Sequence, residues 1–137
     1  MKKKIKILII DDDVFFSKIL KTYLEKVNFE VDCLNTPLDI TTINPYEYDV
    51  IILDMMMPAI SGDILLSVLN DLYLEENDEK KALFPKIILS TSLDRADKKI
   101  VELYESYGDI IYDFLQKPYD MDLLIKTIKK SFENNNE

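Results

Sequence analysis

The sequence predicts an α/β fold in which a doubly wound, five-stranded parallel sheet is covered by five helices on its two faces. Short aliphatic runs without polar alternation, typical of strands buried on both faces, recur along the chain. Segments with apolar residues at helical spacing lie between these runs. Because neighbouring parallel strands need a crossover, and crossovers are right-handed, this alternation places helices on both sides of the sheet.

In the first half of the chain, we expect a strand at residues 5–10, a helix at 14–27, a strand at 29–34, a short helix from 36 that ends before 44, and a strand at 49–53. Asp13 is the expected cap of the first helix. The strand at 29–34 alternates in polarity, which is typical of an edge strand. Thr36 is the expected cap of the short helix, with Pro37 at its first position.

In the second half, we expect a helix from 62 to about 75, an exposed loop at 75–81, a strand at 85–90, a helix from 94 to about 107, a strand at 110–115, and a helix after 120 that runs to 132. Asp94 and Asp120 are the expected caps of the last two helices. Val101 is among the residues expected to face inward, and Gly108 ends its helix. The polar tail at 133–137 is expected to be frayed, which leaves one domain over residues 1–137.

If the alternating second strand is an edge, the strand order is 2-1-3-4-5, a flavodoxin-like sheet. The first and third strands are then neighbours at the point where the order reverses. Ligands of such sheets bind there, outside the carboxyl ends of the strands. A site is therefore expected where these two strands end.

Composition narrows the possible functions. The net charge of -9 argues against direct nucleic-acid binding, and we interpret the basic run at residues 2–4 as a solvated strand entrance. The absence of histidine excludes imidazole bases and most zinc sites. A single cysteine, Cys33, and the lack of a signal peptide or membrane-length apolar run favour a cytoplasmic protein without membrane contact.

Acidic residues gather where the first and third strands end. Asp54 ends the aliphatic run 50–53, and Asp11, Asp12 and Asp13 follow the run 5–10. Carboxylates brought this close repel one another unless a divalent cation neutralises them. Oxygen ligands select a hard ion, and magnesium is the expected cofactor.

The fourth and fifth strands bring a hydroxyl and an ammonium group to the same edge. Ser90 ends one strand and Lys117 follows the other. A carboxylate nucleophile at Asp54, a metal, a lysine and a hydroxyl together suit a phosphoryl group. Thr91 and Ser92 are neighbouring hydroxyls that leave the choice of Ser90 open.

At this point the sequence resembles the receiver domains of two-component response regulators, including the chemotaxis response regulator. The motifs stand in the family's order and spacing over essentially the whole chain: Ile10-Asp11-Asp12, Asp54-Met55-Met56-Met57-Pro58 with Gly62, Ser90 after Ile87-Ile88-Leu89, and Phe114-Leu115-Gln116-Lys117-Pro118. The resemblance implies that Asp54 is the phosphoacceptor, and that Asp11, Asp12 and the backbone carbonyl of Met56 complete the magnesium site. It further implies that Ser90 and Lys117 contact phosphate, and that Phe114 is an aromatic that changes rotamer on activation.

The resemblance also implies a mode of action. A sensor kinase or phosphotransfer protein would supply the phosphoryl group from a phosphohistidine, and the receiver would catalyse only its own phosphorylation and dephosphorylation. Switching would alter the face formed by the fourth helix, fifth strand and fifth helix, and a downstream protein or an output domain outside these residues would read it. A monomer and a phosphorylation-driven dimer are both compatible with the sequence.

Two other functions remain open. A pseudo-receiver would bind partners without phosphorylation, although the intact set of acids, hydroxyl and lysine speaks against it. A phosphatase of the haloacid dehalogenase type would use Asp11 as nucleophile and Asp13 as acid, but Phe15 breaks the pattern of such enzymes and the chain has no cap domain.

Departures from the family pattern are also informative. Thr91 stands where a smaller residue is frequent, and the chain has 109–112 where the family often has Gly-Ala. Met56 and Ser92 occupy two variable positions that influence phosphate lifetime in the family. Because Met56 cannot orient an attacking water, we expect a longer-lived acyl phosphate.

Overall fold

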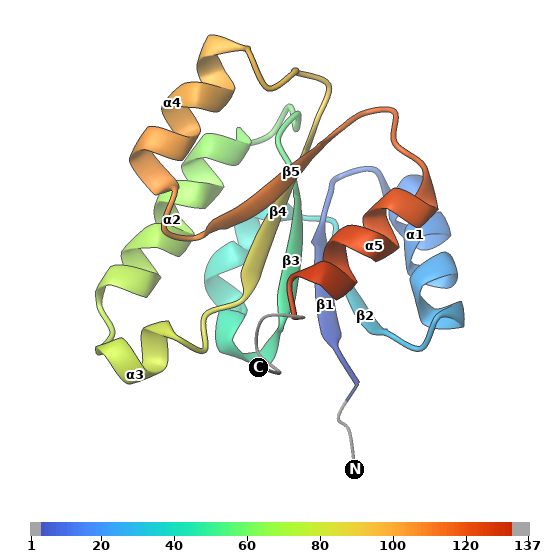
Figure 1. Cartoon of the computed structure of the whole chain (residues 1–137), viewed down its shortest axis with the longest axis horizontal. Coiled ribbons are helices and arrows are strands. Elements are labelled where there is room, and N and C mark those ends of the chain that lie inside the picture. Colours follow the sequence, from blue (N-terminus) through green and yellow to red (C-terminus); the bar gives the residue numbers. More distant parts are fainter. Residues whose placement is uncertain (1–3, 133–137) are drawn as a thin grey trace.

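The computed structural model describes residues 4–132 as a five-stranded parallel sheet between two layers of helices (Figure 1). The strands are β1 (Lys6–Ile10), β2 (Glu30–Leu34), β3 (Val50–Asp54), β4 (Lys86–Thr91) and β5 (Ile111–Gln116). Their order is β2-β1-β3-β4-β5, and every neighbouring pair is parallel. The predicted fold class and strand order are confirmed.

The α-helices are α1 (Val14–Lys26), α2 (Gly62–Leu74), α3 (Asp78–Lys81), α4 (Lys98–Tyr107) and α5 (Met121–Lys130). Two 3₁₀ helices, η1 (Pro37–Thr42) and η2 (Pro45–Glu47), connect β2 to β3. As expected, the side chains of Asp13 and Asp120 cap α1 and α5 by accepting backbone N–H groups of Phe16 and Leu123.

The core consists of two clusters, one on each side of the sheet, because successive side chains of a strand point to opposite faces. Ile7 and Ile9 of β1 pack on the side of α1 and α5. Leu8 and Ile10 pack on the side of η1, α2 and α4. All residues of β3 are buried, which matches its prediction as an interior strand.

The connections from β2 to β3 and from β3 to β4 differ in part from prediction. The short helix expected after Thr36 is the 3₁₀ helix η1, a second 3₁₀ helix, η2, follows it, and the Thr36 hydroxyl donates to Asp39 instead of capping the backbone. The stretch expected as a loop at 75–81 contains α3, one short helix that Asn77 caps by accepting from Lys80. A single turn of helix carries too little periodicity to be recognised in sequence.

The cap of α4 lies three residues after the predicted one. Asp94 caps only a turn, by accepting from Ala96 N, and Asp97 caps the helix itself. Val101 is exposed rather than inward, whereas Ile100 is buried. Both aspartates are good caps in isolation, so only the packing of α4 on the sheet decides between them.

Some expectations concern residues outside the described range: Lys2 and Lys3 of the basic run and the polar tail at 133–137. Within residues 4–132, no helix combines the length and hydrophobicity that a membrane crossing requires.

Candidate functional site

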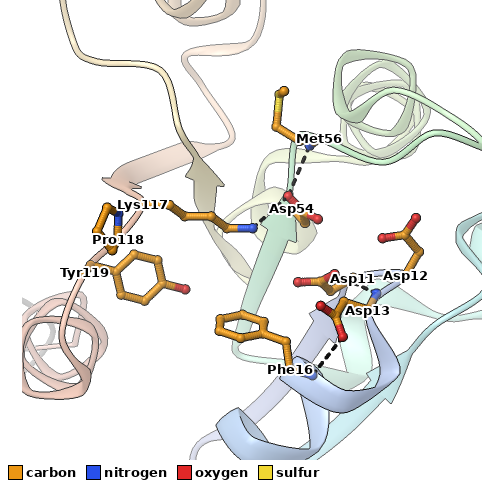
Figure 2. A pocket seen from close by; sticks show the side chains of 9 residues that line it. All are labelled: Asp11, Asp12, Asp13, Phe16, Asp54, Met56, Lys117, Pro118 and Tyr119. Atoms are coloured by element: carbon orange, nitrogen blue, oxygen red, sulfur yellow. Dashed lines mark hydrogen bonds and ion pairs between the residues drawn. The ribbon is translucent and has the colours of Figure 1, made fainter.

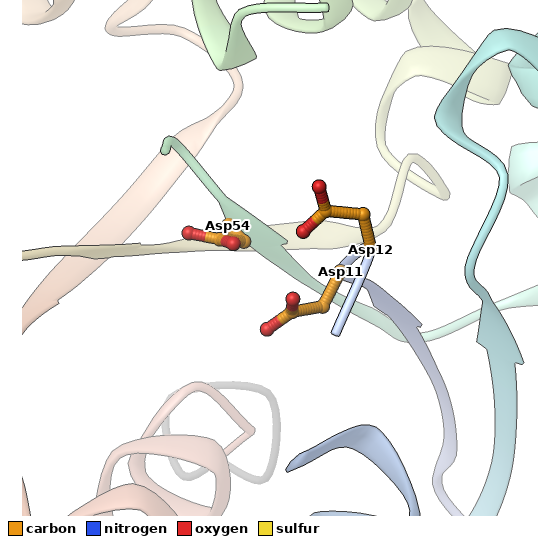
Figure 3. Close-up of side chains that lie close together, drawn as sticks. All are labelled: Asp11, Asp12 and Asp54. Atoms are coloured by element: carbon orange, nitrogen blue, oxygen red, sulfur yellow. The ribbon is translucent and has the colours of Figure 1, made fainter. Parts of the chain in front are cut away.

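The predicted acids meet at the carboxyl edge of the sheet. Asp54 is the last residue of β3, Asp11 follows the neighbouring strand β1, and Asp12 comes next. Each of the three offers one carboxylate oxygen, and these oxygens all lie within 4.8 Å of one another (Figure 3). Residues more than 40 positions apart are thus brought together by parallel strand pairing.

Burial makes this acidic cluster electrostatically costly. Asp11 and Asp54 are each only 4% exposed. Loss of hydration, and to a smaller extent the neighbouring charge of Asp54, raises the pKa of Asp11 to about 6, although the backbone N–H of Asp13 opposes the change. A cation placed among these oxygens would remove the repulsion.

Lys117 supplies one positive charge. It follows β5, and its Nζ lies 3.2 Å from Oδ1 of Asp54 (Figure 2). The same Oδ1 accepts the backbone N–H of Met56 at 3.1 Å, and the Lys117 ammonium also lies 5.5 Å from the centre of the Phe16 ring. One ammonium facing three carboxylates leaves the pocket acidic.

The hydroxyl groups of residues 90–92, at the carboxyl end of β4, have different surroundings. Ser90 is paired with Asp54 in the β3–β4 register, is 3% exposed, and has its Oγ 3.4 Å from the Tyr119 hydroxyl. Thr91 is fully buried, and its Oγ1 accepts the backbone N–H of Leu93. Ser92 is exposed. The geometry therefore favours Ser90, the hydroxyl residue that is paired with Asp54 of β3.

The loop after Asp54 owes its shape to Gly62. A Cβ at this position would lie 2.8 Å from Cα of Met55, closer than atoms of that kind approach.

Asp13, the acid that a dehalogenase-type mechanism would use, has its side chain engaged in capping α1. It lines the pocket, but it is not part of the cluster of three carboxylates.

The three carboxylates and Lys117 line an open pocket of about 590 Å³. Its residues are Asp11, Asp12, Asp13, Phe16, Asp54, Met56, Lys117, Pro118 and Tyr119 (Figure 2). Sequence reasoning missed Phe16 and Tyr119 as pocket residues. The position of Tyr119 two residues after Lys117 is the signal that could have found it, whereas Phe16 fits the apolar face of α1 and carries no such signal.

Phe114 of β5, the aromatic residue predicted to switch, is not part of the pocket lining. Phe114 is buried in the cluster that α2 and α4 cover. The guanidinium of Arg95 lies 4.8 Å from the centre of its ring, and Arg95 also pairs with Asp113 at 3.6 Å. The loop between β4 and α4 is thereby connected to the residue predicted to switch.

The donor set fits magnesium. Three carboxylates each offer an oxygen within 4.8 Å of the others, and the chain has no histidine to supply a nitrogen ligand. The backbone carbonyl of Met56 stays a predicted ligand; Met56 itself lies on the pocket lining.

Comparison with known proteins identifies the fold and the family. The family model described as the response regulator receiver domain matches residues 7–129. A probable transcriptional regulator, ycf29, of Porphyra purpurea is 30% identical over 124 residues, which are 90% of this chain and 54% of the relative. The nisin biosynthesis regulatory protein NisR of Lactococcus lactis is 29% identical over 131 residues, which are 93% of this chain and 50% of the relative.

Solved structures show the same fold. The chemotaxis protein CheY4 of Vibrio cholerae superposes with a TM-score of 0.75 at 19% identity, covering 93% of this chain and 98% of that one. A CheY-like receiver domain from Methanospirillum hungatei gives a TM-score of 0.74 at 20% identity over 98% of both chains. The present chain spans about half the length of the first curated relatives it matches.

Proposed function

The chain belongs to the response regulator receiver domain family, and we propose that Asp54 is its phosphoacceptor. Phosphorylation-dependent switching is the general function of this family, whose members are phosphoacceptor signalling domains rather than classical enzymes. The observation that carries the assignment to Asp54 is its place in the pocket. It is the buried carboxylate that ends the central strand, lies among two other acids and contacts Lys117 at 3.2 Å.

The reaction we propose is transfer from a phosphohistidine to Asp54. As the bond between phosphorus and the Asp54 carboxylate oxygen forms, the phosphorus–nitrogen bond of the donor breaks, and the imidazole leaves with the electron pair and takes up a proton. The chain has no histidine, so the donor has to be another protein. Receiver domains interact with sensor kinases and downstream targets, and a kinase or histidine phosphotransfer protein is the donor we propose.

Magnesium is the cofactor that receiver domains use at their acidic pocket. In this chain Asp11, Asp12, Asp54 and the carbonyl of Met56 would hold it, and when bound it would neutralise charge on the phosphoryl oxygens. The chain's own cation, Lys117, would move its interaction from the Asp54 carboxylate to the phosphoryl group. Ser90 would donate its hydroxyl proton to a second phosphoryl oxygen.

The phosphoryl group would then switch a surface. Ser90 lies near the end of β4, and Lys117 follows β5, the strand that holds Phe114, so contacts made at the phosphate would bias the positions of α4, β5 and α5. We propose that a downstream protein, or an output domain in a longer chain, reads this face. Residues 1–137 form one receiver domain in this proposal, acting in the cytoplasm as a monomer or a phosphorylation-driven dimer without direct contact with nucleic acid or membrane.

The decisive experiment uses magnesium with acetyl phosphate, followed by intact-protein mass spectrometry. We expect a stoichiometric gain of one phosphoryl group in the native protein and none in Asp54→Asn. The control is Asp63→Asn, which removes an exposed acid at the start of α2 and should behave like the native protein.

The other functions give different results. A phosphatase would release phosphate through many turnovers without a stable adduct, and a pseudo-receiver would give neither adduct nor turnover. A stable adduct that persists in Asp54→Asn would show that another residue is the acceptor.

A further inference from the structure

We propose that Tyr119 is a positioning residue of the phosphoryl site, whose phenolic hydroxyl donates to Ser90 Oγ and so directs the Ser90 proton toward a group bound on Asp54. The inference rests on the proposed function and adds a residue to it. Tyr119 is not among the residues that the sequence motifs single out. It enters the site because the chain turns back into the pocket after Lys117 and Pro118 (Figure 2).

The geometry places two hydroxyl groups in series. The Tyr119 ring lines the pocket and its hydroxyl points inward, on the same side as Asp11 and Phe16 (Figure 2). Its oxygen lies 3.4 Å from Ser90 Oγ. Ser90 is the partner of Asp54 in the β3–β4 register, so the serine that contacts the phenol lies on the strand next to Asp54.

Either hydroxyl could donate in this contact, and the direction we propose runs from the phenol to the serine. Burial raises the pKa of Tyr119 despite the hydrogen bond with Ser90 and the nearby Lys117 charge, and Asp11 and Asp54 act in the same direction as burial. The phenol therefore keeps its proton at neutral pH and can donate it. If Tyr119 donates to Ser90 Oγ, the serine proton remains available for a phosphoryl oxygen.

In a chain of two hydroxyls, each hydrogen bond should be stronger than it would be without the other. A hydroxyl that accepts one hydrogen bond becomes a better donor of the next, because each bond polarises the other. Ser90 is almost fully buried, which leaves it little access to water as a replacement donor. The distance of 3.4 Å is long for a bond between hydroxyl groups, and we expect it to shorten when an anion engages Ser90.

The test is a double-mutant cycle with beryllofluoride and magnesium as the phosphoryl mimic. Dissociation constants are measured for the native protein, Tyr119→Phe, Ser90→Ala and the double variant. Tyr119→Phe keeps the ring and removes only the hydroxyl, and we expect about three- to tenfold weaker binding. Ser90→Ala should cost about ten- to hundredfold, which a titration can still follow. When Ser90 is already alanine, Tyr119→Phe should not weaken beryllofluoride binding further.

A matched control is Tyr23→Phe, which removes the same hydroxyl from an exposed tyrosine of α1 and should leave binding unchanged. Native affinity in Tyr119→Phe, or an equal loss with and without Ser90, would overturn the inference while leaving Asp54 as phosphoacceptor. A native protein that binds no beryllofluoride with magnesium would instead overturn the proposed function and this inference with it.

Discussion

Replacing Asp11 with asparagine should stabilise the metal-free protein, although it removes a residue of the proposed magnesium site. Burial and the Asp54 charge raise the pKa of Asp11 from 3.8 to about 6. Each tenfold change in proton affinity corresponds to about 1.4 kcal/mol, so the ionised carboxylate costs the folded state about 3 kcal/mol at neutral pH. Asparagine can still accept from the Asp13 backbone N–H through its oxygen and can donate to Asp54. We expect a gain of about 1–3 kcal/mol in the free energy of unfolding.

The pH dependence has a defined sign. Because the pKa of Asp11 is higher in the folded than in the unfolded state, the folded protein binds more protons between about pH 4 and pH 6. The Asp11 contribution to stability is therefore complete below about pH 4 and is lost as the pH rises to about 6. The advantage of Asp11→Asn should grow over the same interval and stay constant above it.

Magnesium should offset the advantage of Asp11→Asn. A ligand present at about 100 times its dissociation constant stabilises the folded state by about 2.7 kcal/mol. The native protein should gain this stability, whereas Asp11→Asn should gain little because it lacks one carboxylate ligand. Urea unfolding followed by circular dichroism, with chelator and with magnesium, measures both effects.

The control for total charge is Asp71→Asn, which removes an exposed acid near the end of α2. It should show neither the metal-free gain nor the loss of magnesium response. If Asp11→Asn is no more stable than the native protein in chelator at neutral pH, the electrostatic argument for the cluster is wrong.

Three further predictions concern single side chains. Lys117→Ala removes the ammonium 3.2 Å from Asp54, and phosphorylation by acetyl phosphate, measured by intact mass, should slow at least about tenfold; an unchanged rate would exclude Lys117 from the reaction. Met56→Asn places an amide that can orient water on the pocket lining, and loss of phosphate from the phosphoprotein should become severalfold faster; an equal decay rate would contradict the role given to Met56. Arg95→Ala removes the cation from the Phe114 ring and should lower the free energy of unfolding in urea by about 0.5–1 kcal/mol, and full recovery of stability in Arg95→Lys would show that planar stacking is not involved.

Much of the fold could be derived from local patterns. Aliphatic runs such as the one before Asp54 bury all their side chains only inside a sheet that is covered on both faces. The run at 29–34 alternates in polarity, which suits a strand at the edge of the sheet. These two constraints led to the strand order that the structure has. The acids and Lys117 could be predicted to meet because parallel strands deliver all their carboxyl ends to one edge.

Local patterns did not predict helix boundaries where neighbouring residues were equally good caps, or where a helix was very short. Asp94 and Asp97 both cap backbone N–H groups, and nothing within a few residues tells which of them begins α4. The single turn of α3 and the 3₁₀ helices have too few residues for a periodic signal. Helix boundaries of this kind depend on where the segment docks against the rest of the chain.

The sequence by itself determined the parallel sheet, its order and the collection of acids, serine and lysine at one edge, because periodicity and strand ends are local properties. Only the tertiary structure decided how these side chains are oriented: the ammonium of Lys117 on one oxygen of Asp54, and the phenol of Tyr119 against Ser90. Such contacts join residues 29 to 63 positions apart, or select one rotamer among several. They follow from packing and electrostatics summed over the whole fold, which no short stretch of sequence contains.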